Sequence, residues 1–170
     1  PMAAYVPTVR SGSIVYTAGQ LPMVNGQLPR TGKVGAEVPT EVARQLAAQC
    51  ALNALAAIKA EVGELSAVTR VVKVVGFVAS DPDFYDQPEV INGASELLGA
   101  VFGEKGQHAR SAVGVAVLPR NAPVEVEVID AQGPADLAGP VVPDSRSTVA
   151  VAGVGDVELV AIAPGISLRQ

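Results

Sequence analysis

The chain is most strongly β-branched over the segment Val68-Thr-Arg-Val-Val-Lys-Val-Val-Gly-Phe-Val-Ala-Ser80. β-Branched and aromatic side chains fit the pleated surface of a sheet, so this composition favours a strand. The segment ends at Asp81-Pro82-Asp83, a typical turn sequence. We therefore expect the central strand of the fold over residues 68–80.

Helices are expected on both sides of this strand. The segment from Thr40 to Gly63 has no internal glycine or proline, and its ends suit an N-cap threonine and a terminating glycine. It carries two apolar stripes, so both of its faces should be buried. The stripe of mainly small residues, which includes Cys50 as a buried thiol, suits another helix, and the bulkier stripe suits a sheet. A second helix is expected over residues 87–102, ended by Gly103.

Three further strands are expected, over residues 11–20, 109–118 and 124–129. The glycine- and proline-rich segment 21–38 is typical of a loop. Only Pro119-Arg-Asn-Ala-Pro123 separates the last two strands, so a hairpin is the most economical connection between them. This order of elements predicts an α+β fold with both helices on one face of the sheet.

The pattern changes after residue 132. Glycines and prolines are frequent up to Ser145, which indicates a linker, and the apolar segments 148–154 and 157–163 then flank Gly155-Asp156 like the arms of a hairpin. We therefore divide the chain into a body, 1–132, and a C-terminal extension, 133–170. The extension could be an added edge hairpin or an arm that binds a partner, and the sequence does not choose between them.

Composition excludes several classes of protein. The 170 residues are 49% hydrophobic, which argues against disorder and allows a substantial core. A net charge of −5 offers no basic surface for nucleic acid or anionic membranes. One cysteine excludes an internal disulfide and a cysteine-cluster zinc site. No apolar run spans a bilayer and no signal peptide is evident, so the cytoplasm is the expected location.

Nucleotide and metal motifs are not found in the sequence. Gly153-Val154-Gly155 lacks the third glycine and the following helix of a dinucleotide fingerprint, and there is no P-loop. His108 is the single histidine, which excludes a site built from several imidazoles. It could be a lone general base or a structural histidine.

Residues that could act on a carboxylate-bearing ligand lie on the last two expected strands. Arg110 opens one strand and can grip a carboxylate through two hydrogen bonds. Glu125 and Glu127 lie on the next, where either could position or deprotonate a water. The plainer alternative is a surface arginine and two solvated glutamates.

Hairpin geometry sets the distance between Arg110 and Glu125. If Leu118 pairs with Val124, then Glu125 lies opposite Val117 and roughly 20 Å along the strand from Arg110. One subunit could not join them around a small ligand. Either the residues are unrelated, or Arg110 comes from one subunit and Glu125 from a neighbour, which requires an obligate oligomer.

Seven short motifs follow one another along residues 4–130. They are Tyr5-Val6-Pro7, Tyr16-Thr17-Ala18-Gly19-Gln20-Leu21-Pro22, Cys50-Ala51-Leu52-Asn53, Val72-Lys73-Val74-Val75-Gly76-Phe77-Val78, Ala109-Arg110-Ser111-Ala112-Val113, Leu118-Pro119 and Val124-Glu125-Val126-Glu127. In order and spacing they resemble those of the RidA or YjgF-like proteins, reactive intermediate deaminases also described as L-PSP-type endoribonucleases. The segments 92–98 and 108–115 are most similar to a longer branch of the family whose members mostly have no assigned function.

The resemblance implies a chorismate-mutase-like subunit, a mixed β-sheet with two helices on one face. It also implies a homotrimer with three ligand clefts between subunits. The implied reaction is the hydrolysis of imino or enamino acids to 2-oxo acids and ammonia, without cofactor or metal. Arg110 would hold the substrate carboxylate and Glu125 would place the hydrolytic water, while Tyr5 and the backbone around Gly19 would line the cleft.

Two cleft positions depart from the family pattern. Ala18 stands where a serine usually precedes Gly-Gln, and Ala112 stands where a cysteine often follows the arginine by two residues. The retained Arg110 still implies a carboxylate ligand. The 148–163 segment is a candidate replacement for an N-terminal strand at the sheet edge, since the usual segment before Tyr5 is nearly absent.

Two other functions stay open. One is a trimer that binds small acids or scaffolds a partner without turnover, with the extension contacting a neighbouring subunit or another protein. The weaker one is an endoribonuclease, as the older family label suggests. The net charge and a 4% aromatic content give little to hold RNA.

Overall fold

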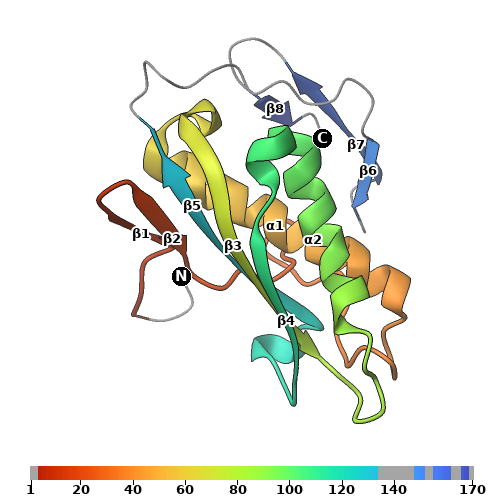
Figure 1. The fold of residues 1–170 in the computed structure, drawn as a ribbon. Helices are drawn as coiled ribbons and strands as arrows, with labels where there is room; N and C mark the ends of the chain where they lie inside the picture. The colour runs from red at the N-terminus through yellow and green to blue at the C-terminus, as the bar shows by residue number, and fades with distance from the viewer. Residues whose placement is uncertain (1–3, 134–147, 152–154, 162–165, 169–170) are drawn as a thin grey trace.

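The computed structural model describes residues 4–133, 148–151, 155–161 and 166–168 (Figure 1). Two α-helices and five strands make up the part before residue 134, and three further strands follow. In chain order the helices and strands are β1 (Thr8–Ser11), β2 (Ile14–Thr17), α1 (Thr40–Val62), β3 (Val68–Ala79), α2 (Gln87–Phe102), β4 (Ala109–Val115), β5 (Val124–Gln132), β6 (Thr148–Val151), β7 (Gly155–Ala161) and β8 (Ile166–Leu168).

The first five strands form one mixed sheet in the order β1-β2-β5-β3-β4. β3 lies between β5, its antiparallel neighbour, and β4, its parallel neighbour. Both helices pack on the same face of this sheet, as Figure 1 shows, and the core lies between the two layers. The predicted α+β fold and the central position of β3 are therefore confirmed.

The predicted hairpin between the fourth and fifth strands is wrong, because β3 separates β4 from β5. The helix α2 makes a crossover from β3 to β4, and a crossover of this length joins parallel neighbours. The chain must then pass to the other side of β3. It does so through a short 3₁₀ turn, Pro119–Asn121, in which Arg120 and Asn121 adopt positive φ values of 58° and 59°.

The helix boundaries agree with the sequence pattern except at one cap. α1 ends at Gly63, whose N–H donates to the Lys59 carbonyl, and α2 ends at Gly103. Thr40 is not the N-cap of α1 but its first helical residue. Pro39 takes the cap position, and its carbonyl accepts the hydrogen bond of Ala43 N–H.

The two apolar stripes of α1 are both buried, but their partners are the reverse of those expected. Cys50, on the small stripe, lies 3.7 Å from the Val124 carbonyl of β5, so this stripe faces the sheet. The close helix contact uses a glycine of the other helix instead. A Cβ atom on Gly93 of α2 would lie 1.9 Å from the Arg44 carbonyl oxygen of α1. Burial of Cys50 raises the pKa of its thiol, as expected for an inert side chain.

The N-terminal and C-terminal strands differ from the predictions in part. The 11–20 segment forms a shorter strand, β2, which pairs with the unpredicted β1. β6 and β7 pair antiparallel as predicted, but Gly155 and Asp156 belong to β7 and not to the turn, and β8 adds a third strand. These three make a separate sheet, so the expectation that they replace a strand at the edge of the main sheet is wrong. None of the helices in the described ranges could cross a membrane.

Candidate functional site

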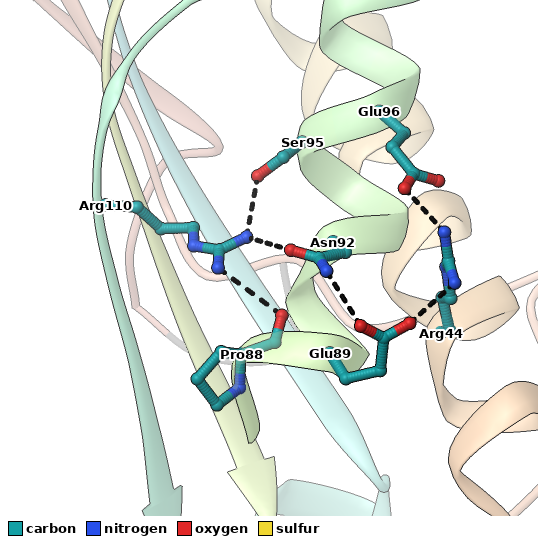
Figure 2. Close-up of polar contacts among 7 residues, drawn as sticks. All are labelled: Arg44, Pro88, Glu89, Asn92, Ser95, Glu96 and Arg110. Carbon is teal, nitrogen blue, oxygen red and sulfur yellow. Dashed lines mark hydrogen bonds and ion pairs between the residues drawn. The ribbon is translucent and has the colours of Figure 1, made fainter. Parts of the chain in front are cut away.

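Arg110 lies on the edge strand β4 and points toward α2 (Figure 2). It pairs in register with Val74, a fully buried residue of the helix-covered face. Its Nη1 donates to Asn92 Oδ1 at 2.9 Å and to Ser95 Oγ at 3.1 Å, and its Nη2 lies 3.4 Å from the Pro88 carbonyl oxygen. One helix therefore fixes the plane of the guanidinium group.

The contacts of Arg110 with α2 continue to the other helix, α1 (Figure 2). Asn92 Nδ2 donates to Glu89 Oε2 at 2.9 Å, and Glu89 Oε1 lies 2.6 Å from Arg44 Nη1 on α1. Arg44 also contacts Glu96 Oε1 at 2.5 Å, and this hydrogen bond raises the pKa of Arg44. The orientation of Arg110 is thus tied to the packing of α1 against α2.

Donors remain available on Arg110 after these contacts. A guanidinium group has five N–H donors, and three are used above. Among the residues that the structure describes, the Nε–H and one Nη2–H of Arg110 have no acceptor. The contact with Pro88 is also longer than an ordinary N–H···O hydrogen bond. Neighbouring donors of this kind suit a carboxylate.

Glu125 lies on the opposite face of the same sheet. It pairs with Phe77 of β3 and alternates with the buried Val124 and Val126, so its side chain points away from the helices. Burial, and then the neighbouring negative charge of Glu127, raise the pKa of Glu125. A carboxyl group with a raised pKa can accept and return a proton nearer neutral pH.

Gly19 leaves the space that the Glu125 side chain occupies. A Cβ atom at Gly19 would lie 1.8 Å from Glu125 Oε1. The backbones are held together next to this contact, because Gln20 and Val126 exchange hydrogen bonds of 2.9 and 3.0 Å. The structure therefore brings two of the predicted site residues, Gly19 and Glu125, into direct proximity.

Arg110 and Glu125 do not meet within one chain. Their partners on β3, Val74 and Phe77, are three residues apart, and two strand spacings separate β4 from β5. These offsets place the two Cα atoms about 14 Å apart. The estimate of 20 Å is wrong because it assumed the hairpin, and the two side chains also lie on opposite faces.

The remaining predicted site residues divide between these two groups. Ala18 precedes Gly19, and its N–H donates to the Pro7 carbonyl at 2.8 Å. Pro7 lies two residues after Tyr5, which is exposed. Ala112 pairs with Gly76 and lies on the helix side of β4, with Arg110. One set is thus Tyr5, Ala18, Gly19 and Glu125, and the other is Arg110 and Ala112.

Sequence reasoning did not identify the residues that hold Arg110. Asn92 and Ser95 lie three residues apart on α2, a spacing that places both on one helix face. That spacing is a signal in the sequence, but it becomes specific only once α2 is known to cross over next to β4. Across the described ranges, no group of three or more metal-ligating side chains is found.

Comparison with known proteins places the chain in a family. The family model described as Endoribonuclease L-PSP matches residues 1–132. Protein TCP17 of Trypanosoma cruzi is 44% identical over 130 residues, which cover 76% of this chain and 81% of that protein. A 2-iminobutanoate/2-iminopropanoate deaminase of Dermatophagoides farinae is 35% identical over 129 residues, covering 76% and 86%.

A solved structure agrees with these matches. Protein Atu1372 of Agrobacterium tumefaciens, of unknown function, is 50% identical with a TM-score of 0.75, and the match covers 78% of this chain and 85% of that one. Together with the shared motifs and the mixed sheet under two helices, these matches show that the chain belongs to the endoribonuclease L-PSP family, the RidA or YjgF-like proteins.

Proposed function

We propose that the protein hydrolyses reactive imino or enamino acids to 2-oxo acids and ammonia, at clefts between the subunits of a homotrimer and without a cofactor. The observation that carries this proposal is the fixed guanidinium group of Arg110, which retains donors on Nε and Nη2 for a carboxylate. The deaminase of D. farinae, a relative covered over most of its length, supports the same class of reaction.

The chemistry needs a positioned substrate and a positioned water. The carbon of the C=N group is already electrophilic, so water can add to it once Arg110 holds the carboxylate. Glu125 takes a proton from the attacking water and passes it to the imine nitrogen, which gives a carbinolamine. Glu125 then takes the hydroxyl proton of the carbinolamine and passes it to the same nitrogen, so the C–N bond breaks, ammonia leaves and the C=O bond forms. The raised pKa of Glu125 suits this exchange.

A second copy of the chain brings Arg110 and Glu125 together in this proposal. The sheet face that carries Glu125 also carries half-exposed apolar side chains, Tyr16 at 44% and Val113 at 45% exposure. Burial of such side chains favours association. With this face covered by a neighbour, Glu125 of one subunit can lie beside Arg110 of another.

The test couples the purified protein to a pyridoxal-phosphate-dependent threonine dehydratase, which generates the imino acid, and follows its decay by semicarbazide trapping. The wild type should accelerate the decay, and Arg110→Ala should abolish the acceleration. Arg110→Lys should be severely impaired, because an ammonium group lacks the paired donors of a guanidinium group. Arg10→Ala is the control, since Arg10 is exposed on β1 and, among the residues that the structure describes, its side chain hydrogen-bonds to the Gly12 carbonyl in its own turn.

The outcomes separate the candidate functions. Full activity in Arg110→Ala would refute the assignment of Arg110. Saturable binding of a 2-oxo acid without any acceleration would favour a trimer that binds small acids. Cleavage of RNA that persists through purification and disappears in Arg110→Ala would instead favour the endoribonuclease.

A further inference from the structure

A serine and the single histidine of the chain are connected to Arg110. His108 lies two residues before Arg110, where β4 begins, and Ser95 lies on α2. His108 Nδ1 is 2.6 Å from the Gly106 carbonyl oxygen, His108 Nε2 is 3.0 Å from Ser95 Oγ, and Ser95 Oγ is 3.1 Å from Arg110 Nη1. The reaction proposed above uses neither His108 nor Ser95.

The partners at the two ends of this series of hydrogen bonds determine which atoms carry the hydrogens. A carbonyl oxygen only accepts, so His108 Nδ1 carries a hydrogen and donates to Gly106. A guanidinium nitrogen only donates, so Ser95 Oγ accepts from Arg110. When the imidazole is neutral, its Nε2 has a free lone pair, and the Ser95 hydroxyl donates to it.

His108 therefore keeps the Ser95 hydroxyl oriented. With its hydrogen directed to His108, Ser95 presents a lone pair to Arg110. Without His108 the hydroxyl could rotate and turn its hydrogen toward the guanidinium group, which would remove that acceptor. Ser95 thus acts on Arg110 by direct contact, and His108 acts on Arg110 through Ser95.

The same heavy-atom positions accommodate a protonated imidazole. Nε2 then donates to Ser95 Oγ, which accepts from both His108 and Arg110, and no side chain needs to move. The two contacts keep Nε2 and Nη1 within about 6 Å of each other. Ser95 Oγ therefore accepts from Arg110 with either form of the imidazole.

Other charged groups lie on the elements around His108. Glu89 and Glu96 of α2 are both engaged by Arg44 of α1. Arg110 is joined to His108 through the hydroxyl of Ser95. The others are Glu104 and Lys105, in the 3₁₀ turn that precedes His108, and Lys73 of β3, which pairs with Ala109.

We propose that Ser95 and His108 are positioning residues for Arg110. Ser95 holds the guanidinium group by direct contact, and His108 holds the Ser95 hydroxyl in the orientation that accepts from it. The inference rests on the proposed carboxylate site at Arg110.

The test measures 2-oxobutanoate binding by isothermal titration calorimetry at one pH. Ser95→Ala removes the acceptor and should weaken binding about fivefold, and Ser95→Thr, which keeps the hydroxyl, should restore it. His108→Ala should also weaken binding, because nothing then directs the Ser95 hydrogen away from Arg110. His108→Gln, whose amide oxygen can accept from Ser95, should restore it.

Each outcome has a distinct meaning. Binding that depends on Arg110 but is unchanged in Ser95→Ala and His108→Ala would overturn the positioning roles and leave the proposed function intact. Absence of binding by the wild type would refute both the positioning roles and the carboxylate site.

A second measurement needs no variant. Because the chain has one histidine, its imidazole nitrogens give a single set of ¹⁵N signals in the full-length protein. We expect the Nδ1–H tautomer at pH 8.5, because His108 Nδ1 donates to the Gly106 carbonyl. The Nε2–H tautomer at high pH would contradict the proton assignment on which the proposal depends.

Discussion

The two faces of the main sheet are built from the same strands but differ in what completes them. On the covered face, Val74, Val126 and Val128 are fully buried beneath α1 and α2. On the open face, Tyr16 and Val113 remain almost half exposed in the single chain. The covered face is therefore finished by local folding, whereas the open face is the one that we propose a neighbouring subunit covers.

A charged side chain should prevent folding when it is introduced on the covered face, but should affect only assembly when it is introduced on the open face. Among our predictions this difference is the largest effect. Val74→Asp introduces a buried, unpaired carboxylate beneath the helices and should prevent stable folding. Val113→Asp should leave the monomer folded but dissociate the trimer. Circular dichroism reports folding, and size-exclusion chromatography with light scattering reports the mass of the assembly.

The result that would break the comparison is a Val113→Asp protein that still assembles as a trimer. The open face would then not be the subunit interface. Monomeric wild-type protein at micromolar concentration would have the same meaning, and it would leave Arg110 and Glu125 without a shared cleft.

The covered face should also be sensitive to the distance between its two helices. Gly93→Ala places a methyl group against the Arg44 carbonyl, so α1 and α2 must separate. We expect a loss of about 3 kcal/mol in the free energy of unfolding, measured by chemical denaturation. Gly99 lies in the same helix, and a Cβ atom there would meet nothing within 4 Å, so Gly99→Ala is the matched control.

Gly99→Ala should stabilise the protein by about 0.5–1 kcal/mol, since alanine restricts the unfolded chain more than glycine does. Equal effects of the two substitutions would show that the close helix contact at Gly93 does not govern stability. Gly93→Ala should also weaken ligand binding, because the contacts of Arg110 run through both helices.

A smaller effect is expected from Asp130, a carboxyl group on the covered face. Asp130 is fully buried, and its Oδ1 has no hydrogen-bond partner within the described residues, although Gln132 donates to Oδ2. Burial raises the pKa of Asp130 from 3.8 to about 7. The folded protein therefore binds this proton more tightly than the unfolded chain, so the stability that it provides is lost as pH rises from about 4 to 7.

Asp130→Asn removes this titration. A pKa change from 3.8 to about 7 corresponds to about 4 kcal/mol above pH 7, and we expect the amide to recover about 2 kcal/mol because it keeps an unpaired polar atom. Denaturation at pH 8 should show the gain, and at pH 4 the variant and wild type should be similar. An unchanged pH profile would show that Asp130 is ionised without cost.

Much of this arrangement could be predicted from local sequence. The first helix could be predicted because it contains no glycine or proline and Gly63 follows it. The second could be predicted because its apolar residues recur at helical spacing and Gly103 follows it, and β3 because its β-branched run is long. The position of β4 in the sheet could not be predicted in this way. Pro119–Asn121 looks like a hairpin connection, and nothing in the local sequence shows that β3 lies between β4 and β5.

The candidate site divides in the same way. Arg110, Glu125 and Gly19 were named from their motifs, and the structure places the last two side by side. Asn92 and Ser95 were missed as partners of Arg110, and His108 as a partner of Ser95, since hydrogen bonds across elements depend on the crossover geometry. The faces of Arg110 and Glu125 also followed only from strand order, because a hairpin and a crossover give different registers.

The hydrogen bonds that tie Arg110 to α2 have a consequence for the size of ligand that the site can hold. A free arginine side chain carries about 2 kcal/mol of rotamer entropy, which a ligand would otherwise have to overcome when it immobilises the guanidinium group. Here Asn92 and Ser95 restrict the side chain as the protein folds. At the carboxylate site that we propose, a molecule of only a few heavy atoms would therefore need no large apolar surface of its own to bind.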